Sequence, residues 1–312
     1  MLIKLPISKS IANRLLMLQA IHGDELMPVT ADMPDDVLVL HDALEQLREF
    51  SRKSKAERQK NPLTLYLKNC GTALRFLQVH LEKCYPGEPI TLTGDPRLME
   101  RVGAPTTQTT SALILHGVDV PWEDPENGYI LLSRILTMQY DRKEPIEMEF
   151  DWSSTAFWYE YVAIHRNTSI VFDQLRIGSL QSDSIVSVLY SMYFGVETEL
   201  LYEENSLQIS AVNDWKKQPV KWNFEECPDL YPAVALTCER LGVPLEATGT
   251  ERLRYKESDR LEAVRLHEVR NDHRMAMALM AADFPVSEEE QACIAKSYPQ
   301  FVEQFRQITS EP

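Results

Sequence analysis

A short charged segment, residues 254–263 (RYKESDRLEA), is the first part of this sequence that could do chemistry. It places Lys256, Glu257, Asp259 and Arg260 within five residues. A carboxylate held between cations in a closed pocket has its pKa set by those cations, and it can donate or accept a proton. The same spacing allows a surface salt bridge between Glu257 and Arg260 at i, i+3. Local physics alone favours that simpler interpretation.

Basic residues and hydroxyls gather at the predicted starts of four helices. Free N–H groups and the helix dipole favour anions at a helix N-terminus, whereas cations there oppose the dipole. Added Arg and Lys side chains turn such an end into a site for phosphate or carboxylate. The four sets are Lys9, Ser10 and Arg14; Asn69, Gly71, Thr72 and Arg75; Ser153 and Ser154; and Asp272, His273 and Arg274. For any one set a surface cation is the simpler interpretation, but the recurrence favours an anionic ligand.

Two further residues are candidates in combination with the others. Asp229 precedes an apolar helix in CPDLYPAV, where it could cap the helix, act in catalysis or do both. Lys296 lies among small and apolar residues in CIAKSYP. Neither G-x-x-x-x-G-K-[ST] nor G-x-G-x-x-G occurs in the sequence. The residues therefore predict an enzyme for anionic substrates that uses no nucleotide P-loop.

Composition argues against several other classes of protein. The 312 residues are 44% hydrophobic and 25% charged, and the formal net charge of −15 argues against a nucleic-acid partner. No apolar run approaches a membrane span and no signal-peptide core is seen, so we expect a cytoplasmic protein with no membrane partner. Five cysteines without a CxxC pair, and His267 and His273 six residues apart, predict no disulfide framework and no metal. We expect no cofactor and a monomer.

The elements that must position the charged residues alternate between strands and helices. Helices are predicted at residues 8–21, 35–50, 69–81, 152–164, 182–195, 227–242 and 271–282, and strands at 3–6, 63–67, 89–94, 169–175 and 243–249. The polar, basic segment 51–62 is predicted to be a solvated loop. The pattern T-G-x-x-R-L follows an apolar strand twice, in residues 92–101 and 247–256. This echo predicts an α/β (α+β) fold of two similar halves joined near residue 150.

In order along the chain, the motifs resemble those of the EPSP synthase (3-phosphoshikimate 1-carboxyvinyltransferase) family. The nine segments are LPISKSIANR, NCGTALR, LTGDPRLMER, DWSSTAFW, SLQSDS, CPDLYPAVAL, RYKESDRLEA, NDHRMAMAL and AKSYPQFVEQF. Each segment is modestly specific, and their common order is highly specific. The related UDP-N-acetylglucosamine enolpyruvyl transferases have a reactive cysteine on a loop that would lie near residues 95–110, where this sequence has none.

The resemblance implies a two-domain enolpyruvyl-transferase-like fold of repeated βαβαββ units, some of them incomplete here. The N-terminal lobe would comprise residues 9–149, and the C-terminal lobe residues 1–8 and 150–312. The implied reaction transfers the enolpyruvyl group of phosphoenolpyruvate to the 5-hydroxyl of shikimate 3-phosphate and releases phosphate, in the shikimate pathway of aromatic amino acid biosynthesis. Both substrates are anionic, in agreement with the basic helix starts.

The resemblance also implies a role for each candidate residue. The catalytic residues would be Lys9, Asp229, Glu257 and Lys296. Shikimate 3-phosphate would be bound by Lys9, Ser10, Arg14, Ser133, Asp229 and Lys256. Phosphoenolpyruvate would be bound by Lys9, Asn69, Gly71, Arg101, Arg260, Arg274 and Lys296. Asp229 would take the proton of the 5-hydroxyl, and Glu257 would handle the proton at the methylene carbon.

The sequence departs from the family pattern in several places. Ile7 and Ser182 stand where the family has glycine, and a Ser-Ser-Gln segment expected between residues 125 and 150 is absent there. Only eleven residues separate Arg260 from Asp272, too few for a helix and two strands. A degenerate relative that binds anionic ligands without turnover is therefore the rival hypothesis. The retention of the seven charged residues Lys9, Arg101, Asp229, Glu257, Arg260, Arg274 and Lys296 favours an active enzyme.

Overall fold

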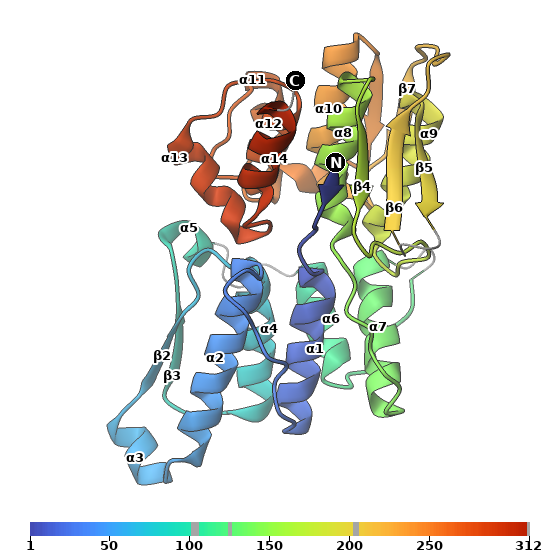
Figure 1. Cartoon of the computed structure of the whole chain (residues 1–312). Helices are drawn as coiled ribbons and strands as arrows, with labels where there is room; N and C mark the ends of the chain where they lie inside the picture. The colour runs from blue at the N-terminus through green and yellow to red at the C-terminus, as the bar shows by residue number, and fades with distance from the viewer. Residues whose placement is uncertain (101–105, 124–126, 202–205, 311–312) are drawn as a thin grey trace. The chain divides into compact units, whose positions relative to one another are not determined.

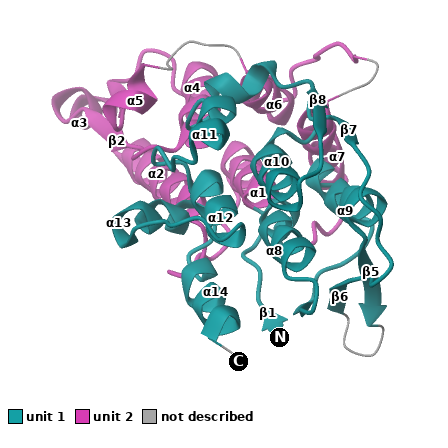
Figure 2. Cartoon of the chain, turned by 90° about the horizontal axis from the view of Figure 1, so that it is seen from above, with its two compact units in different colours: residues 1–8, 149–312 teal, residues 9–148 magenta. Residues whose placement is uncertain are grey.

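The chain forms two compact units, and the backbone passes from one unit to the other near residues 8 and 149. The structure, a computed structural model, describes residues 1–100, 106–123, 127–201 and 206–310. Unit 1 comprises Met1–Ser8 and Glu149–Pro312, and unit 2 comprises Lys9–Met148 (Figure 2). The departing and returning chain segments pair within unit 1. The amide of Ser8 donates to the carbonyl of Glu149 at 2.7 Å, and the amide of Asp151 donates to the carbonyl of Pro6 at 2.9 Å.

Unit 1 contains a βαβαββ arrangement whose first strand comes from the N-terminus (Figure 1). Its elements are β1 (Leu2–Ile3), α8 (Trp152–Ile164), β4 (Ser169–Phe172), the 3₁₀ helix η1 (Ser182–Ile185) with α9 (Val186–Phe194), β5 (Val196–Leu201) and β6 (Ser206–Ala211). The sheet order is β1-β4-β6-β5, with β1 parallel to β4 and the other pairs antiparallel. The helix α8 is buried on every side from Trp152 to Ala163, which explains its nearly continuous apolar sequence.

A second, shorter arrangement in unit 1 carries most of the charged candidates. It consists of β7 (Val220–Asn223), the 3₁₀ helix η2 (Pro228–Leu230), α10 (Tyr231–Leu241), β8 (Leu245–Thr248), the 3₁₀ helix η3 (Glu251–Tyr255) and α11 (Arg260–Leu266). The strands β7 and β8 are parallel. The chain then continues through α12 (His273–Ala281), α13 (Glu288–Gln291), the 3₁₀ helix η4 (Ala292–Lys296) and α14 (Phe301–Ser310). Unit 1 is thus of mixed α and β structure.

The connection between α11 and α12 contains no strand, and the structure describes this stretch in full. The spacing of Arg260 and Asp272 correctly predicted that two strands would not fit there. Three residues of this connection that are not glycine have left-handed backbone angles: His267 (φ 54°), which is the C-cap of α11, Arg270 (φ 52°) and Asn271 (φ 57°). Such angles are uncommon and cost free energy outside glycine.

Unit 2 is mainly helical, and its two-stranded parallel sheet of β2 and β3 lies at one edge of the unit, beside α2 (Figure 1). Its elements are α1 (Lys9–His22), α2 (Asp35–Arg52), α3 (Lys55–Lys60), β2 (Leu63–Tyr66), α4 (Gly71–Cys84), β3 (Ile90–Thr93), α5 (Pro96–Met99), α6 (Thr107–Leu115) and α7 (Gly128–Asp141). The prediction of a loop over residues 51–62 was wrong for α3. Ser54 and Glu57 form a capping box there, and this reciprocal pair can start a short polar helix without apolar periodicity.

The repeated T-G pattern marks two equivalent strand pairs. In unit 2 the amide of Leu67 donates to the carbonyl of Thr93 at 2.8 Å, just beyond the paired ends of β2 and β3. In unit 1 the amide of Phe224 donates to the carbonyl of Thr248 at 2.9 Å, just beyond β7 and β8. Both pairs are joined by one helix, α4 or α10, so each forms a βαβ unit.

The glycine of each T-G pair lies against the backbone that follows the first strand. A Cβ atom on Gly94 would lie 2.6 Å from the carbonyl oxygen of Lys68. A Cβ atom on Gly249, which has φ +65°, would lie 2.6 Å from the amide nitrogen of Glu225. Both contacts are shorter than any side chain tolerates, so both repeats need glycine at this point.

The core of unit 1 is rich in aromatic side chains around α8, α12 and α14. Phe301 contacts the ring of Trp158 at 5.1 Å and that of Tyr298 at 5.5 Å between ring centroids. The hydroxyl of Tyr298 donates to the carbonyl of Lys4 at 3.1 Å, which ties the N-terminal segment to this core. Within the described part of the chain, no helix combines the length and the apolar character that crossing a membrane requires.

Candidate active site

One carboxylate in unit 1 forms ion pairs with three cations. Asp229 lies in η2, and its Oδ1 accepts from Nη1 of Arg260 at 2.6 Å and lies 3.4 Å from Nζ of Lys256. Its Oδ2 lies 3.0 Å from Nη2 of Arg274. The sequence left open whether Asp229 caps a helix. The N-cap residue of α10 is Leu230, and the Asp229 carboxylate faces the cations.

A second carboxylate, Asp272, fixes Arg260 from the other side. Asp272 caps α12 by accepting from the amide of Arg274 at 3.0 Å, and it accepts from Nε of Arg260 at 2.8 Å and from Ser258 Oγ at 3.0 Å. Arg260 is only 2% exposed. Although burial opposes its charge, Asp272 and Asp229 together raise the pKa of Arg260. Burial also opposes the charge of Asp272, but Arg260 keeps the pKa of that carboxyl below its usual value.

Glu257 is clamped between residues that are distant in the sequence. Its Oε1 accepts from Nζ of Lys296 at 2.6 Å, and its Oε2 lies 2.7 Å from Nδ1 of His273. Lys296 ends η4 and His273 begins α12, so two elements converge on this carboxylate. The surface i, i+3 pair with Arg260 does not describe the segment, because Arg260 is buried. A carboxylate with two short hydrogen bonds to basic groups is arranged for proton transfer.

Lys256 differs from Arg260 and Arg274, because its pKa is lowered whereas theirs are raised. Burial lowers its pKa, Asp229 raises it, and the neighbouring Arg260 and Arg274 lower it further, so that the net shift is downward. A phosphate or carboxylate placed beside Lys256 would favour its charged form. Together the residues provide an array of two buried arginines and two partly buried lysines, with the carboxylates of Asp229 and Glu257 among them.

The start of α8, a predicted anion site, is occupied by carboxylates of the protein itself. Asp151 caps α8 and accepts from Ser154 Oγ at 2.5 Å, and Ser153 Oγ donates to Asp183. Burial, followed by the charge of Asp229, raises the pKa of Asp183 to about 6, while Arg274 opposes this shift. The hydroxyls of Ser153 and Ser154 therefore serve internal carboxylates.

In unit 2, Lys9 and Ser10 open α1. Nζ of Lys9 lies 3.5 Å from Oδ2 of Asp36, on the first turn of α2, and both side chains are largely buried. The pair is long for a hydrogen bond, so the ammonium group keeps donors available for a ligand. Ser10 is half-buried in the first turn of the helix.

Arg14, expected to bind shikimate 3-phosphate, is bonded within unit 2. Its Nε donates to Ser133 Oγ at 2.8 Å, and Nη2 donates to Ser111 Oγ and to the carbonyl of Tyr129, both at 3.0 Å. Its Nη1 donates to the carbonyl of Ser10 at 2.8 Å. Burial lowers the pKa of Arg14 to about 10, although the charge of Tyr129 opposes this shift. Ser133, also expected to bind this substrate, is fully buried, so both predicted roles require these bonds to be exchanged.

The start of α4 brings together the predicted residues Gly71, Thr72 and Arg75 with Gln108 of α6, which was not predicted. Arg75 Nη1 donates to the carbonyl of Gly71 at 3.0 Å and to Oε1 of Gln108 at 3.3 Å. Nε2 of Gln108 donates to Thr72 Oγ1 at 2.8 Å, which places the first turns of α4 and α6 side by side. Asn69 lies in the turn that precedes α4.

The sequence around Gln108 contains a pattern that could have identified this residue. Thr106, Thr107 and Gln108 supply two hydroxyls followed by an amide, the pattern of the Ser-Ser-Gln segment that was expected between residues 125 and 150. The hydroxyl of Thr106 is buried and has no hydrogen-bond partner among the described residues. This Thr-Thr-Gln segment lies before residues 125–150, the stretch in which the Ser-Ser-Gln pattern was expected.

The structure thus divides the candidates between the units. Unit 1 brings together Asp229, Lys256, Glu257, Arg260, Arg274 and Lys296, and unit 2 contains Lys9, Ser10, Arg14, Asn69, Gly71 and Ser133. Arg101 lies outside the described residues. Neither Ile7 nor Ser182 has a left-handed backbone, so neither position needs glycine for its backbone angle.

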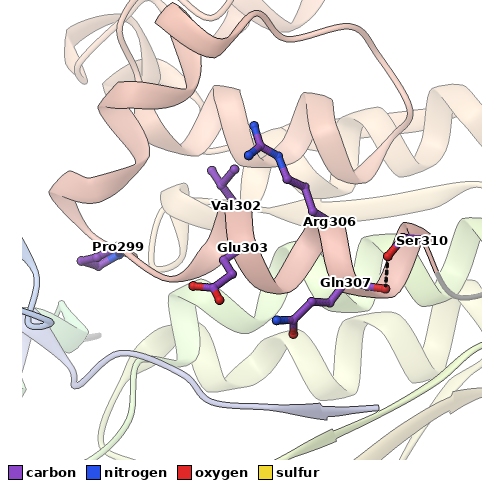
Figure 3. Close-up of a pocket in the computed structure, with 6 residues that line it drawn as sticks. All are labelled: Pro299, Val302, Glu303, Arg306, Gln307 and Ser310. Carbon is purple, nitrogen blue, oxygen red and sulfur yellow. Dashed lines mark hydrogen bonds between the residues drawn. The ribbon is translucent and has the colours of Figure 1, made fainter.

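A cavity of about 520 Å³ elsewhere in unit 1 involves none of these residues. It is lined by Pro299, Val302, Glu303, Arg306, Gln307 and Ser310. Figure 3 shows these side chains along α14 and just before it. Its polar groups do not converge on one point, in contrast to the cations around Asp229.

A family model and relatives from Bacteroides fragilis match this chain along most of its length. The model of the family EPSP synthase (3-phosphoshikimate 1-carboxyvinyltransferase) matches residues 2–133 and 137–267. The 3-phosphoshikimate 1-carboxyvinyltransferase of Bacteroides fragilis (strain ATCC 25285) is 27% identical over 391 aligned positions, which cover 97% of this chain and 94% of the relative. That alignment is longer than the 312-residue chain, so the relative has segments that this chain lacks.

Two shorter matches agree. The 3-phosphoshikimate 1-carboxyvinyltransferase of Clostridium kluyveri is 33% identical over 197 residues, covering 53% of this chain and 44% of the relative. The enzyme of the same name from Escherichia coli (strain SMS-3-5) is 36% identical over 139 residues, covering 40% of this chain and 31% of the relative. The resemblance inferred from the motifs is confirmed, and the chain belongs to the EPSP synthase family.

Proposed function

We propose that this chain transfers the enolpyruvyl group of phosphoenolpyruvate to the 5-hydroxyl of shikimate 3-phosphate and releases phosphate. The observation that carries the proposal is the clamp on Glu257, whose oxygens lie 2.6 Å from Nζ of Lys296 and 2.7 Å from Nδ1 of His273. The transfer protonates the methylene carbon of phosphoenolpyruvate to form a tetrahedral intermediate and later removes a proton from that carbon. A carboxylate that shares hydrogen bonds with two basic groups is suited to both steps.

Asp229 would act as the base for the 5-hydroxyl, and its ion pairs explain how substrate binding activates it. The carboxylate of Asp229 forms ion pairs with Arg260, Arg274 and Lys256. The carboxylate and phosphate of phosphoenolpyruvate would compete for the two arginines. Each cation that turns to the substrate leaves Asp229 freer to accept a proton.

The rival function, binding of anionic ligands without turnover, is favoured by two observations. The connection between α11 and α12 lacks strands and has left-handed angles at His267, Arg270 and Asn271. Arg14 and Ser133, expected to hold shikimate 3-phosphate, bond to each other. Substrate affinity alone therefore does not distinguish the two functions, and the test must follow turnover.

The test is phosphate release from phosphoenolpyruvate in the presence and absence of shikimate 3-phosphate. We expect release only with both substrates, and a loss of about 10²-fold or more in Glu257→Gln, which keeps the shape of the side chain but cannot carry the proton. Glu262→Gln is the matched control, because Glu262 is exposed on α11 and pairs with Arg270. We expect it to retain the activity of the parent chain.

Calorimetry with each substrate separates the remaining outcomes. Binding of both substrates by a folded chain that releases no phosphate would establish the degenerate binder and overturn the transferase. Release that is equal in Glu257→Gln and the parent would retain the transferase but remove Glu257 from the proton steps.

A further inference from the structure

Three side chains with metal-binding atoms converge in unit 2, at the C-terminal ends of α4 and α6. His80 and Cys84 lie one turn apart near the end of α4, and His116 directly follows α6. Nδ1 of His80 lies 3.3 Å from Nε2 of His116. The sulfur of Cys84 completes a set whose ligand atoms all lie within 4.8 Å of one another.

The helices fix this arrangement. Residues at i and i+4 lie on the same face of a helix, so α4 presents His80 and Cys84 together. The bond between Gln108 and Thr72 joins the first turns of α6 and α4, and the contact between His116 and His80 joins their last turns. The two helices therefore run parallel, and their packing holds His116 against the α4 pair.

The separation of the two imidazoles fits a shared metal ion. Ring nitrogens that each lie about 2.0–2.1 Å from a tetrahedral zinc are about 3.3 Å apart. His80 is buried and His116 is half-buried, and the neutral form of an imidazole is the one that binds a metal. The simpler interpretation is one hydrogen bond between two neutral rings, which would not involve Cys84.

We propose that His80, Cys84 and His116 bind a zinc-like divalent ion, with water as the fourth ligand. Two imidazoles and a thiol select borderline-soft metals over Mg²⁺ and Ca²⁺. Cys84 is exposed, so the fourth position is open to solvent. The Cys84 thiol loses its proton to solvent as the metal–sulfur bond forms. The positive charge of Lys83, which acts on His116, opposes the ion and makes the site weaker than a closed four-residue site.

The ion would cross-link the ends of α4 and α6 and so stiffen the helix pair whose first turns carry Gly71, Arg75 and Gln108. The proposal does not depend on turnover or on either substrate. The sequence contains no CxxC pair and no two histidines at i, i+4, so its local patterns predicted no metal. The i, i+4 pair of His80 and Cys84 needs a third ligand 36 residues from His80, which only the fold reveals.

The test uses cobalt(II) as a spectroscopic probe on the full chain after treatment with a chelator. We expect one cobalt per chain, visible bands of tetrahedral intensity and a near-ultraviolet sulfur-to-cobalt charge-transfer band, all removed when zinc displaces cobalt. Cys84→Ser should abolish the charge-transfer band and weaken binding at least tenfold. His116→Gln should weaken binding at least tenfold. Any cobalt that still binds to this variant should show the sulfur-to-cobalt band.

Matched controls are Cys293→Ser, which removes a half-buried thiol of unit 1, and His22→Gln, which removes a histidine paired with Asp141 on unit 2. Both should bind cobalt as the parent chain does. Circular dichroism of the metal-free proteins checks that every variant is folded. Absence of stoichiometric binding, or binding that Cys84→Ser and His116→Gln leave unchanged, would overturn the site and leave a hydrogen bond between two histidines.

Discussion

Two buried arginines, Arg260 in unit 1 and Arg14 in unit 2, are held in opposite ways. Arg260 is 2% exposed and bonds to the carboxylates of Asp229 and Asp272. Arg14 is 3% exposed and bonds to hydroxyls and carbonyls, among them Ser133 Oγ. The pKa of Arg260 is raised because its two carboxylates outweigh burial, whereas burial lowers the pKa of Arg14 to about 10.

The difference shows that burial of a cation does not by itself identify its task. The charge of Arg260 is already compensated, so an anionic substrate near it must take the place of Asp229 or Asp272. Among the described residues no carboxylate forms an ion pair with Arg14, so a nearby anion would add compensation without displacing any. Its directional donors are nevertheless occupied, and they brace α1 against α6 and α7. Unit 1 thus contains an arginine in ion pairs that a ligand would have to replace. Unit 2 contains an arginine without a paired carboxylate among the described residues, held in place by neutral hydrogen-bond partners.

Replacing Arg260 should have the largest effect on stability. Arg260→Met leaves Asp272, which is fully buried, without its main cation, and breaking such a pair costs about 3–5 kcal/mol. Denaturant unfolding followed by tryptophan fluorescence measures this loss in unit 1, which contains Trp152, Trp158, Trp215 and Trp222 of the five tryptophans.

The control for this experiment lies on the same helix. Arg265 is exposed on α11 and forms only a 3.8 Å pair with Glu262, so Arg265→Met should change stability by less than about 0.5 kcal/mol. If Arg260→Met lowers the free energy of unfolding no more than the control does, the carboxylate of Asp272 must be protonated or solvated easily once Arg260 is removed.

Arg14→Met should have an intermediate effect. The neutral partners of Arg14 lose hydrogen bonds, at about 1–3 kcal/mol, but no unpaired charge is left behind. Hydroxyls such as Ser133 Oγ, which also donates to the carbonyl of Tyr129 at 2.9 Å, keep a partner. Because unit 2 contains one of the five tryptophans, far-ultraviolet circular dichroism is the better measurement.

Arg142→Met is the matched control, because Arg142 is exposed at the C-terminal end of α7. A loss for Arg14→Met that equals or exceeds that of Arg260→Met would contradict the contrast between compensated and uncompensated arginines. Calorimetry with shikimate 3-phosphate on the same variant would show whether Arg14 also contributes to ligand affinity, as its uncompensated charge predicts.

The contrast between the arginines also shows what the sequence could and could not predict. Local signals located the elements: Asp272 was recognised at a helix start, the T-G pairs marked equivalent strand ends, and the short spacing after Arg260 predicted the missing strands. Caps, periodicity and glycine positions depend on neighbours in the sequence, so they can be seen without a fold.

The partners of the charged side chains could not be seen in this way. Glu257 bonds to a histidine 16 residues away and a lysine 39 residues away, and Arg14 bonds to a serine 119 residues away. These contacts depend on how the helices pack, which no local pattern encodes. The helix α6 was missed for a related reason, because its short apolar run lacks a clear amphipathic period.

Glu160 is a buried ionisable group that has neither the ion pairs of Arg260 nor the hydrogen bonds of Arg14 among the described residues. It lies in α8, is fully buried, and neither carboxylate oxygen has a hydrogen-bond partner among the described residues. Burial, followed by the charge of Asp283, raises its pKa well above the usual value. Unlike Arg260 or Arg14, Glu160 can avoid the cost of a buried charge by keeping its proton.

The smallest expected effect is a change in stability with pH, which a comparison of Glu160→Gln with the parent chain should reveal. A folded-state pKa above the unfolded value of about 4.3 gives stability that is fully present below that pH and is lost as pH rises toward the folded value. The parent chain should therefore lose up to about 1.4 kcal/mol relative to the variant between pH 5 and pH 6. Fluorescence-detected unfolding at the two pH values measures the difference, and Glu303→Gln, on the exposed side of α14, should show none. Parallel pH profiles for the parent chain and Glu160→Gln would mean that the carboxyl of Glu160 titrates as it does in the unfolded chain, and that water reaches α8.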